Sequence, residues 1–311
     1  MKIIQIGTGG WGKNHCRVLS ELGVLSAVCD KDLHLAEEFG KKYSVNFYNS
    51  LETLLEKEEF DAAFICTPTI THADIAAKLI ESKKHVFVEK PLTYLSEDGQ
   101  KLVDMANKNN VVLTCGYIER FNPAVSTVKD FLTSKKYGDL IRLEFYREHR
   151  MPQHIKDVGI IYDTAVHDID TAMWLFGKTP EVVFAIAGKI NHEHEDFATI
   201  MLGFKDNKTA TISSNWITPT RVRNFNAVCT DGRIFSDFIT QEIRIETDHG
   251  TENPKNEKTE PLLLEIKNFL GAIETKNDIK VKAEQAVNVT KIAEAALLSS
   301  QKGIPIYLDI K

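Results

Sequence analysis

The first thirty residues constrain the fold of this chain more than any other stretch. An apolar segment at residues 3–6 runs into G-T-G-G-W-G at residues 7–12, a helical segment follows, and a second apolar segment ends in Asp30. A strand, a glycine-rich turn, a helix and an acid about 20 residues further on form a dinucleotide-binding βαβ unit. An ordinary glycine-rich loop would not require this context. We therefore predict a nucleotide site here.

Each glycine of this run has its own mechanical role in such a site. Gly7 permits the tight turn, Gly9 lets the backbone approach a pyrophosphate, and Gly12 lets the helix pack against the strand. The free N–H groups at the helix N-terminus then attract the phosphates. Asp30 would bind the adenosine ribose and repel a 2′-phosphate, which favours NAD, although the adjacent Lys31 leaves NADP open.

Strand-like and helical segments alternate as far as about residue 118, which predicts a parallel, doubly wound α/β domain over residues 1–118. Ligands of such sheets bind at the carboxyl ends of the strands. The further expected strands are residues 47–48, 60–66, 85–88 and 111–114, and the helices between them are residues 33–42, 51–57, 71–82 and 96–107.

The pattern changes in residues 119–311, where consecutive strands follow one another with short turns. Such an order predicts an α+β domain with a large, open, mostly antiparallel sheet. Because an open sheet needs cover on its second face, we expect a homo-dimer or homo-tetramer. The expected strands are residues 140–150, 181–190, 196–204, 208–217, 222–229, 232–238 and 304–310, and the helices are residues 123–132, 160–176, 261–275 and 283–300.

Composition excludes several classes of function. The 311 residues carry a net charge of −6 with no basic stripe, so we expect neither nucleic acid nor a membrane surface as a partner. The five cysteines are scattered and never form a C-x-x-C pair, which argues against disulfides and structural zinc. No apolar run has the length of a membrane span, and the start does not resemble a signal peptide. We therefore expect a cytoplasmic protein.

The first chemically suggestive motif is Glu89-Lys90-Pro91 at the end of an expected strand. Proline fixes the local backbone and can take a cis bond. A lysine held there could stabilise the alkoxide that develops as hydride leaves a substrate hydroxyl. The alternative is an ordinary surface lysine before a loop proline, and the residues alone leave the two interpretations even.

The second motif is D-T-A-V-H, which starts at Asp163. On a helix Asp163 and His167 share one face, and an aspartate can fix the tautomer of an imidazole and raise its basicity. The alternative is a solvated polar face, although apolar residues surround the pair. We expect no metal, because no further ligand stands at a suitable spacing. His192 and His194 lie among acidic residues and indicate an exposed turn.

Four motifs together resemble the Gfo/Idh/MocA family of NAD(P)-dependent oxidoreductases: G-T-G-G-W-G-K-N-H at residues 7–15, C-T-P-T-I-T-H at 66–72, V-E-K-P at 88–91 and G-I-I-Y-D-T-A-V-H-D-I-D at 159–170. The resemblance covers essentially the whole chain. It implies a Rossmann domain, a second domain whose open sheet mediates dimers or tetramers, and catalysis by Lys90, Asp163 and His167. The expected cofactor-binding residues are Gly7, Gly9, Gly10, Trp11, Gly12, Asp30, Thr67, Pro68, Thr69, His72, Glu89 and Lys90.

Within that family, R-F-N-P at residues 120–123 and the arginine before D-V-G look like the nucleotide-sugar branch. Its dehydrogenases oxidise the 3-hydroxyl of UDP-N-acetylglucosamine or its uronic acid. Arginine forks match a diphosphate or a carboxylate, so two of the arginines are candidates for binding one, with a surface salt bridge as the equal alternative. The expected substrate-binding residues are Lys90, Tyr117, Arg120, Asn122, Arg150, Asp163 and His167.

These observations predict an NAD-dependent sugar dehydrogenase that oxidises a UDP-N-acetylhexosamine at C3. In this hypothesis His167 takes the hydroxyl proton, Lys90 stabilises the developing oxyanion, and Asp163 orients the histidine. One alternative is an inositol- or free-sugar dehydrogenase of the same family. Another is a non-catalytic NAD-dependent regulator, which the presence of both Lys90 and His167 disfavours.

Overall fold

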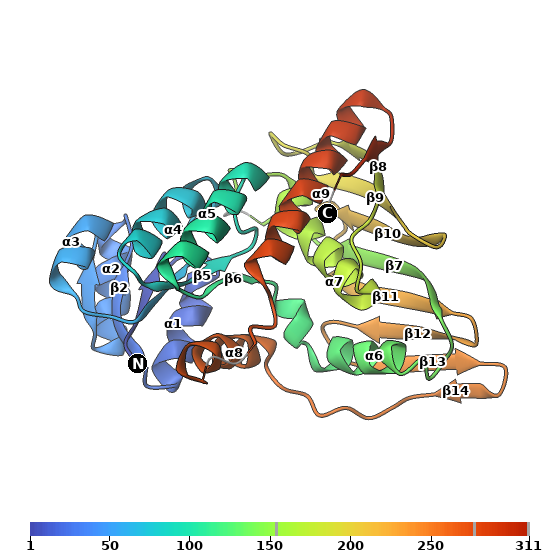
Figure 1. The fold of residues 1–311 in the computed structure, drawn as a ribbon, viewed down its shortest axis with the longest axis horizontal. Helices are drawn as coiled ribbons and strands as arrows, with labels where there is room; N and C mark the ends of the chain where they lie inside the picture. The colour runs from blue at the N-terminus through green and yellow to red at the C-terminus, as the bar shows by residue number, and fades with distance from the viewer. Residues whose placement is uncertain (153–154, 276–277, 310–311) are drawn as a thin grey trace. The chain divides into compact units, whose positions relative to one another are not determined.

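A computed structural model describes residues 1–152, 155–275 and 278–309. The chain divides into two compact units (Figure 1). The first contains Met1–Gly116 and Leu262–Val287, and the second contains Tyr117–Pro261 and Asn288–Lys311. The proposed boundary at residue 118 is close to the first crossing, but the chain returns to the first unit near its end. Among the described residues, none of the helices combines the length and the apolar character that a membrane span requires.

The first unit contains a six-stranded parallel sheet in the order β3-β2-β1-β4-β5-β6. This is the order of a dinucleotide-binding fold, and it confirms the predicted doubly wound sheet. The order brings the carboxyl ends of β1, β2, β4 and β5 to one edge. The strands are β1 (Ile3–Ile6), β2 (Leu25–Cys29), β3 (Asn46–Tyr48), β4 (Ala62–Ile65), β5 (His85–Glu89) and β6 (Leu113–Gly116).

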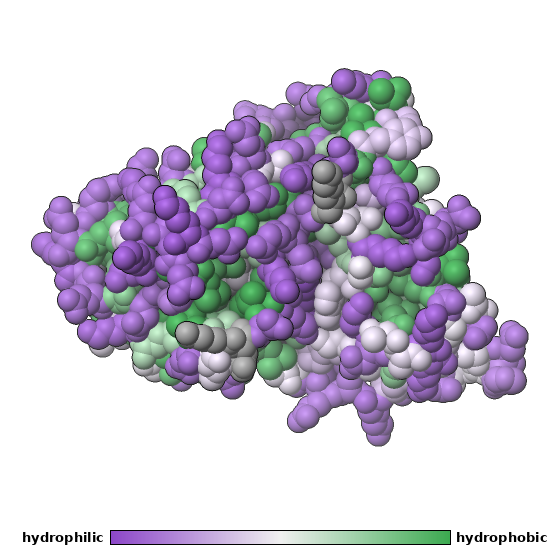
Figure 2. Space-filling view, in the orientation of Figure 1, coloured by the Kyte–Doolittle hydropathy of each residue, from purple (hydrophilic) through white to green (hydrophobic). Residues whose placement is uncertain are grey.

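Amphipathic helices connect these strands. Asp32 and Ser50 begin two of them as N-caps, since their side chains accept the N–H groups of His34 and Thr53. Figure 2 shows hydrophilic residues over much of the outer surface of α3, α4 and α5. The helices are α1 (Gly12–Glu21), α2 (Leu33–Tyr43), α3 (Leu51–Lys57), α4 (His72–Glu81) and α5 (Ser96–Asn109).

Helix α8 (Pro261–Thr275) packs with the first sheet although it follows the second in sequence. Phe269 stands edge-on to Phe64 and Phe87, with ring centroids 5.3 and 5.7 Å apart. Further along, the Thr114 hydroxyl donates a hydrogen bond of 2.8 Å to the carbonyl of Val281. Edge-on aromatic pairs stabilise beyond their buried area, so this segment completes the core of the first unit.

The second unit is built on a nine-stranded sheet in the order β14-β13-β12-β11-β7-β10-β9-β8-β15. Only the β7–β10 pair is parallel, which confirms the open, mostly antiparallel sheet. Strands β13 and β14 were not expected, and β15 is shorter than expected. The strands are β7 (Leu140–Glu148), β8 (Val182–Gly188), β9 (Phe197–Phe204), β10 (Lys208–Asn215), β11 (Val222–Cys229), β12 (Gly232–Asp237), β13 (Ile243–Thr247), β14 (Gly250–Glu252) and β15 (Ile306–Tyr307).

The two faces of this sheet differ. Alternate residues of β7, including Leu143 and Phe145, are buried, because helices of the same unit cover that face. The opposite face exposes Tyr146, Ile186 and Met201, by 40, 61 and 51%. The remaining helices are η1 (Thr69–Thr71), η2 (Ile118–Phe121), α6 (Pro123–Thr133), the π-helical turn η3 (Ile161–Ala165), α7 (Val166–Phe176) and α9 (Ala283–Lys302).

Candidate active site

The glycine-rich loop after β1 is compact on one side and open on the other. Gly7 has a φ of +81°, and a Cβ atom there would lie 2.3 Å from the carbonyl oxygen of Cys66. A Cβ atom on Gly12 would lie 2.0 Å from the carbonyl oxygen of Gly7. Above Gly9, by contrast, the nearest side-chain atom would be 3.8 Å away. The loop therefore fits a pyrophosphate on the Gly9 side, next to the N-terminus of α1.

Asp30 follows β2 and contacts this loop directly. One carboxylate oxygen accepts the Thr8 N–H at 2.7 Å and the Thr8 hydroxyl at 3.0 Å. The other accepts the N–H of Asp32 at 3.0 Å. Gly10 has a φ of +44°, and Trp11 is exposed beside it. The carboxylate thus holds the loop in place at the strand end where a ribose would bind.

We expect Gly12→Ala to disrupt this loop. Its added methyl group meets the backbone of Gly7, which cannot rotate away, so overpacking should cost about 1–3 kcal/mol and weaken NAD binding. Gly271→Ala in α8 is the matched control, because open space surrounds that position. Titration calorimetry with NAD and thermal unfolding would measure both effects. An unchanged NAD affinity in Gly12→Ala would contradict this role of the loop.

The Glu89 carboxylate holds the E-K-P turn at the end of β5 in place. The Lys90–Pro91 bond is cis. One Glu89 oxygen lies 2.8 Å from His15 Nε2, and the other accepts the Lys90 N–H at 3.0 Å. A Cβ atom at Gly116 would lie 3.0 Å from the Glu89 carboxylate, so the glycine leaves it room. Glu89, expected to bind cofactor, is 8% exposed and fixes the backbone of Lys90, and its contact with the cofactor stays a prediction.

His72 performs a similar structural task. Its Nδ1 lies 2.8 Å from the carbonyl oxygen of Pro91, and its Nε2 lies 2.9 Å from that of Thr67. The ring is 1% exposed, so it joins the loop after β4 to the E-K-P turn. Thr69 is also buried, whereas Pro68 is exposed. Of the four residues of this segment that are expected to bind the cofactor, Thr67, Pro68, Thr69 and His72, the structure buries Thr69 and His72.

One group of potential metal ligands occurs in the described part of the chain. The ligand atoms of His15, Cys66 and Glu89 lie within 4.8 Å of one another. Burial, with the charge of Glu89 adding to it, raises the pKa of the Cys66 thiol well above its usual value. A neutral thiol is a poor metal ligand, and His15 is already bonded to Glu89. We interpret the group as the hydrogen-bonded support of Lys90.

In the second unit, Asp163 and His167 lie on two different kinds of helix. We expected one continuous helix from residue 160, but Asp163 is in the π-helical turn η3 and His167 is in the first turn of α7. Single π turns recur at functional sites. Nearby, the Trp216 indole donates to the Thr164 hydroxyl at 3.2 Å. The Tyr117 ring stands edge-on to His167, with centroids 6.5 Å apart.

Two models of known protein families match this chain. Residues 1–117 match the model of an oxidoreductase family with an NAD-binding Rossmann fold, and residues 125–235 match the GFO/IDH/MocA C-terminal domain. The chain belongs to the Gfo/Idh/MocA family. It is therefore an enzyme of a family of NAD(P)-dependent oxidoreductases that act on CH–OH groups.

Relatives in this family have different substrates. The chain is 27% identical to the UDP-N-acetylglucosamine 3-dehydrogenase of Acidithiobacillus ferrooxidans over 88% of each chain. It is also 27% identical to the Thermotoga maritima myo-inositol 2-dehydrogenase, over 80% of this chain and 78% of the relative. The solved structure of the Acidithiobacillus enzyme has a TM-score of 0.89 at 25% identity and covers 97% of this chain and 98% of that one.

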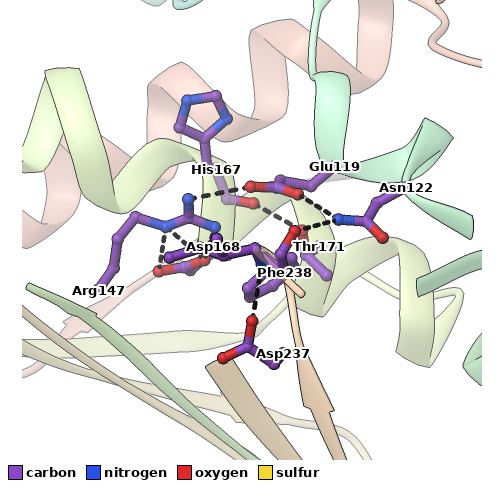
Figure 3. Close-up of polar contacts among 9 residues, drawn as sticks. Glu119, Asn122, Arg147, His167, Asp168, Thr171, Asp237 and Phe238 are labelled. Carbon is purple, nitrogen blue, oxygen red and sulfur yellow. Dashed lines mark hydrogen bonds and ion pairs between the residues drawn. The ribbon is translucent and has the colours of Figure 1, made fainter. Parts of the chain in front are cut away.

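A buried ionic network of Arg147, Asp168 and Glu119 lies beneath the start of α7, the helix that carries His167. Arg147 bonds both oxygens of Asp168, with a shortest distance of 2.8 Å, and reaches Glu119 at 3.0 Å. In Figure 3 the His167 ring points away from this network. Burial alone would lower the pKa of Arg147, but the charges of Asp168 and Glu119 outweigh it and raise the pKa. The network fixes the start of α7 against β7 and η2.

Three residues expected to bind substrate have structural partners here. Arg120 is 1% exposed and forms a two-bond pair with Asp170 at 2.8 and 2.6 Å, so its guanidinium is occupied. Asn122 caps α6 and donates to the carbonyl of Phe238 at 2.9 Å. Arg150 is exposed and donates to the carbonyl of Ile217 at 3.2 Å. Arg120 and Asn122 therefore hold the scaffold together, and their binding of substrate stays a prediction.

Glu195 supports Asp163 and was not predicted to do so. Its carboxylate accepts the N–H of Ile161 at 3.2 Å, and its carbonyl accepts that of Ile160 at 2.9 Å.

The next residue, Asp196, is 1% exposed and accepts three N–H groups of the turn at residues 190–192. This turn is thus anchored rather than simply exposed. In the sequence, the only indication that Asp196 anchors this turn is the general capacity of aspartate to accept nearby backbone N–H groups.

We expect Glu195→Gln and Glu195→Ala to behave differently. Burial raises the pKa of Glu195, so its ionised form costs stability that increases as pH rises. Glutamine can accept the same N–H without a charge, so it should keep activity and flatten the loss of stability that begins as pH rises above the ordinary pKa of a carboxyl group. Alanine leaves the N–H of Ile161 unpaired, at a cost of about 1–3 kcal/mol. Thermal unfolding and turnover between pH 5 and 9 would measure this, and equal behaviour of the two variants would contradict it.

Proposed function

We propose that the protein oxidises a secondary hydroxyl of a nucleotide-linked sugar to a ketone, with NAD as the hydride acceptor. The observation that carries the proposal is the geometry of the D-x-x-x-H segment. Asp163 lies on a π turn that Glu195 and Trp216 hold on both sides, and His167 points away from the buried network. An imidazole paired with a carboxylate is suited to accept a proton, and these are the roles that we assign to His167 and Asp163.

Each of the three expected catalytic residues has a separate role. His167 accepts the hydroxyl proton, and Asp163 stabilises the imidazolium that results. Lys90, on a turn fixed by Glu89, stabilises the negative charge that develops on the substrate oxygen. NAD supplies the hydride acceptor when it is bound to the Gly7–Gly12 loop. The position of Asp30 next to that loop supports NAD over NADP.

The substrate we favour is a UDP-N-acetylhexosamine that reacts at C3. This choice is supported by the dehydrogenase of Acidithiobacillus ferrooxidans, which matches the chain in both sequence and fold. The inositol dehydrogenases are equally identical in sequence, so a free polyol is the second candidate.

A spectrophotometric assay with NAD and matched substrates distinguishes them. Turnover of UDP-N-acetylglucosamine, with none of free N-acetylglucosamine or myo-inositol, would support the nucleotide-sugar assignment. Turnover of only the free polyols would replace it. Tight NAD binding without turnover of any of these substrates would instead favour a regulator.

We also propose that the open face of the nine-stranded sheet mediates a homo-dimer or homo-tetramer. Ile186 and Met201 expose large apolar side chains there, on neighbouring strands. Apolar groups gathered on one face favour association, since it removes them from water. Light scattering on Met201→Glu and on the wild type would test this, and an unchanged mass would count against the interface.

A further inference from the structure

Arg223 on β11 is a partly buried arginine whose side chain has no ion pair among the described residues. Its Nε is fully buried and lacks a hydrogen-bond partner in the described part of the chain. Buried charges are normally paired, because the loss of hydration strongly disfavours a buried charge without a partner. The two carboxylates whose charges act on Arg223 are those of Glu119 and Asp168, and both are already bonded to Arg147.

The register of the sheet makes this position more unusual. Arg223 lies directly opposite Arg147 in the antiparallel β7–β11 pair. Opposite residues of such a pair point to the same face, and like charges there destabilise the sheet. That face is the one α7 covers, because Arg147 reaches Asp168 on α7. Two guanidinium groups thus stand side by side on the inner face.

Further cationic groups lie around Arg223. His149 follows β7 by one residue and Arg221 precedes β11 by one residue, so strand alternation continued by one residue places them on the face of Arg147 and Arg223. Burial lowers the pKa of His149, with the charges of Arg223 and Arg221 lowering it further while Asp163 opposes them. The charges of Arg223, Arg221 and Asp163 thus all act on the His149 ring. Burial, together with Arg147 and Arg221, lowers the pKa of Arg223 to about 10.

We propose that Arg223, with Arg221 and His149 beside it, forms the subsite for an anionic group of the substrate, a phosphate or a carboxylate. An anion would pair the buried guanidinium, relieve its repulsion with Arg147 and place the sugar toward Asp163. This inference rests on the proposed function, because it assumes that a substrate binds beside Asp163 and His167. The anion-binding role first considered for Arg120 thus passes to Arg223, whose side chain has no ion pair with any of the described residues.

Binding rather than turnover tests the subsite, so the result does not depend on knowing the sugar. Inorganic pyrophosphate and D-glucuronate are titrated into the full-length protein by calorimetry, with NAD saturating so that the glycine loop is occupied. We expect the wild type to bind at least one of these probes and Arg223→Gln to weaken that binding at least tenfold. Arg142→Gln, on the exposed part of β7, is the matched control and should bind like the wild type.

The two probes separate the sources of the anion. Pyrophosphate binding that is lost in Arg223→Gln supports a phosphate, and glucuronate binding that is lost supports a carboxylate. Arg221→Gln, at an exposed position, should weaken the same probe several-fold and keeps the test valid if Arg223→Gln does not fold. Absence of binding to the wild type, or equal binding by wild type and both variants, overturns the subsite. Probe binding without turnover of any sugar would refute the proposed function alone.

Discussion

His167→Asn should lower kcat by a factor on the order of 10² to 10⁴, the usual contribution of a general base. Asparagine is close in size, and the network beneath α7 does not use the imidazole, so the fold should persist. Because hydroxide can replace a missing base, kcat of the variant should keep rising with pH where the wild type reaches a plateau. Stopped-flow reduction of NAD between pH 6 and 10 would show this.

Lys90→Ala provides the contrast to that variant. Loss of an oxyanion-stabilising group costs about 10²- to 10³-fold in kcat, and added hydroxide does not replace it. The pH profile of this variant should therefore be low at every pH. Lys101→Ala, an exposed lysine on α5, is the control. A kcat within twofold of the wild type in either His167→Asn or Lys90→Ala would remove that residue from the mechanism.

The parts of the fold that depend on local pattern were predictable. The spacing of Gly7, Gly12 and Asp30 specifies a βαβ unit, because each residue meets a backbone requirement of its own. The return of α8 to the first unit was not predictable, since it depends on Phe269 meeting Phe64 and Phe87, which lie far away in sequence. Helical periodicity shows that α8 is amphipathic but does not say which sheet it covers.

In the candidate site, too, some features follow from the local sequence pattern and others depend on residues far away in the sequence. The spacing of Asp163 and His167 predicts a catalytic pair, but the π turn that carries Asp163 depends on distant partners, chiefly Glu195 and Trp216. Arginines could be chosen as anion-binding candidates by type alone. Whether one is available depends on its carboxylate partner, which Arg120 has in Asp170. Pairing in space, rather than residue type, separates structural arginines from functional ones.

Arg147→Met should give the largest loss of stability of the variants considered. It leaves the buried carboxylates of Asp168 and Glu119 without their cation, which typically costs about 3–5 kcal/mol and lowers Tm by on the order of 10 °C. The Arg147 guanidinium also lies 4.7 Å from the centre of the Phe238 ring, a cation–π contact that methionine would lose. Arg142→Met on the same strand, 53% exposed at its side chain, should change stability by less than about 1 kcal/mol.

The pH dependence of Arg147→Met identifies the cause of that loss. Burial already raises the pKa of Asp168 in the folded wild type against the opposing charge of Arg147, so removal of the guanidinium should raise it further above its unfolded value. Groups with a raised folded pKa stabilise the protein at low pH and lose that contribution as pH rises, so the deficit of the variant should shrink between pH 8 and 5. Adding Asp168→Asn should recover part of the lost Tm at pH 8. A deficit that is constant with pH would show that Arg147 acts through packing, and that its charge does not hold α7 and His167 in place.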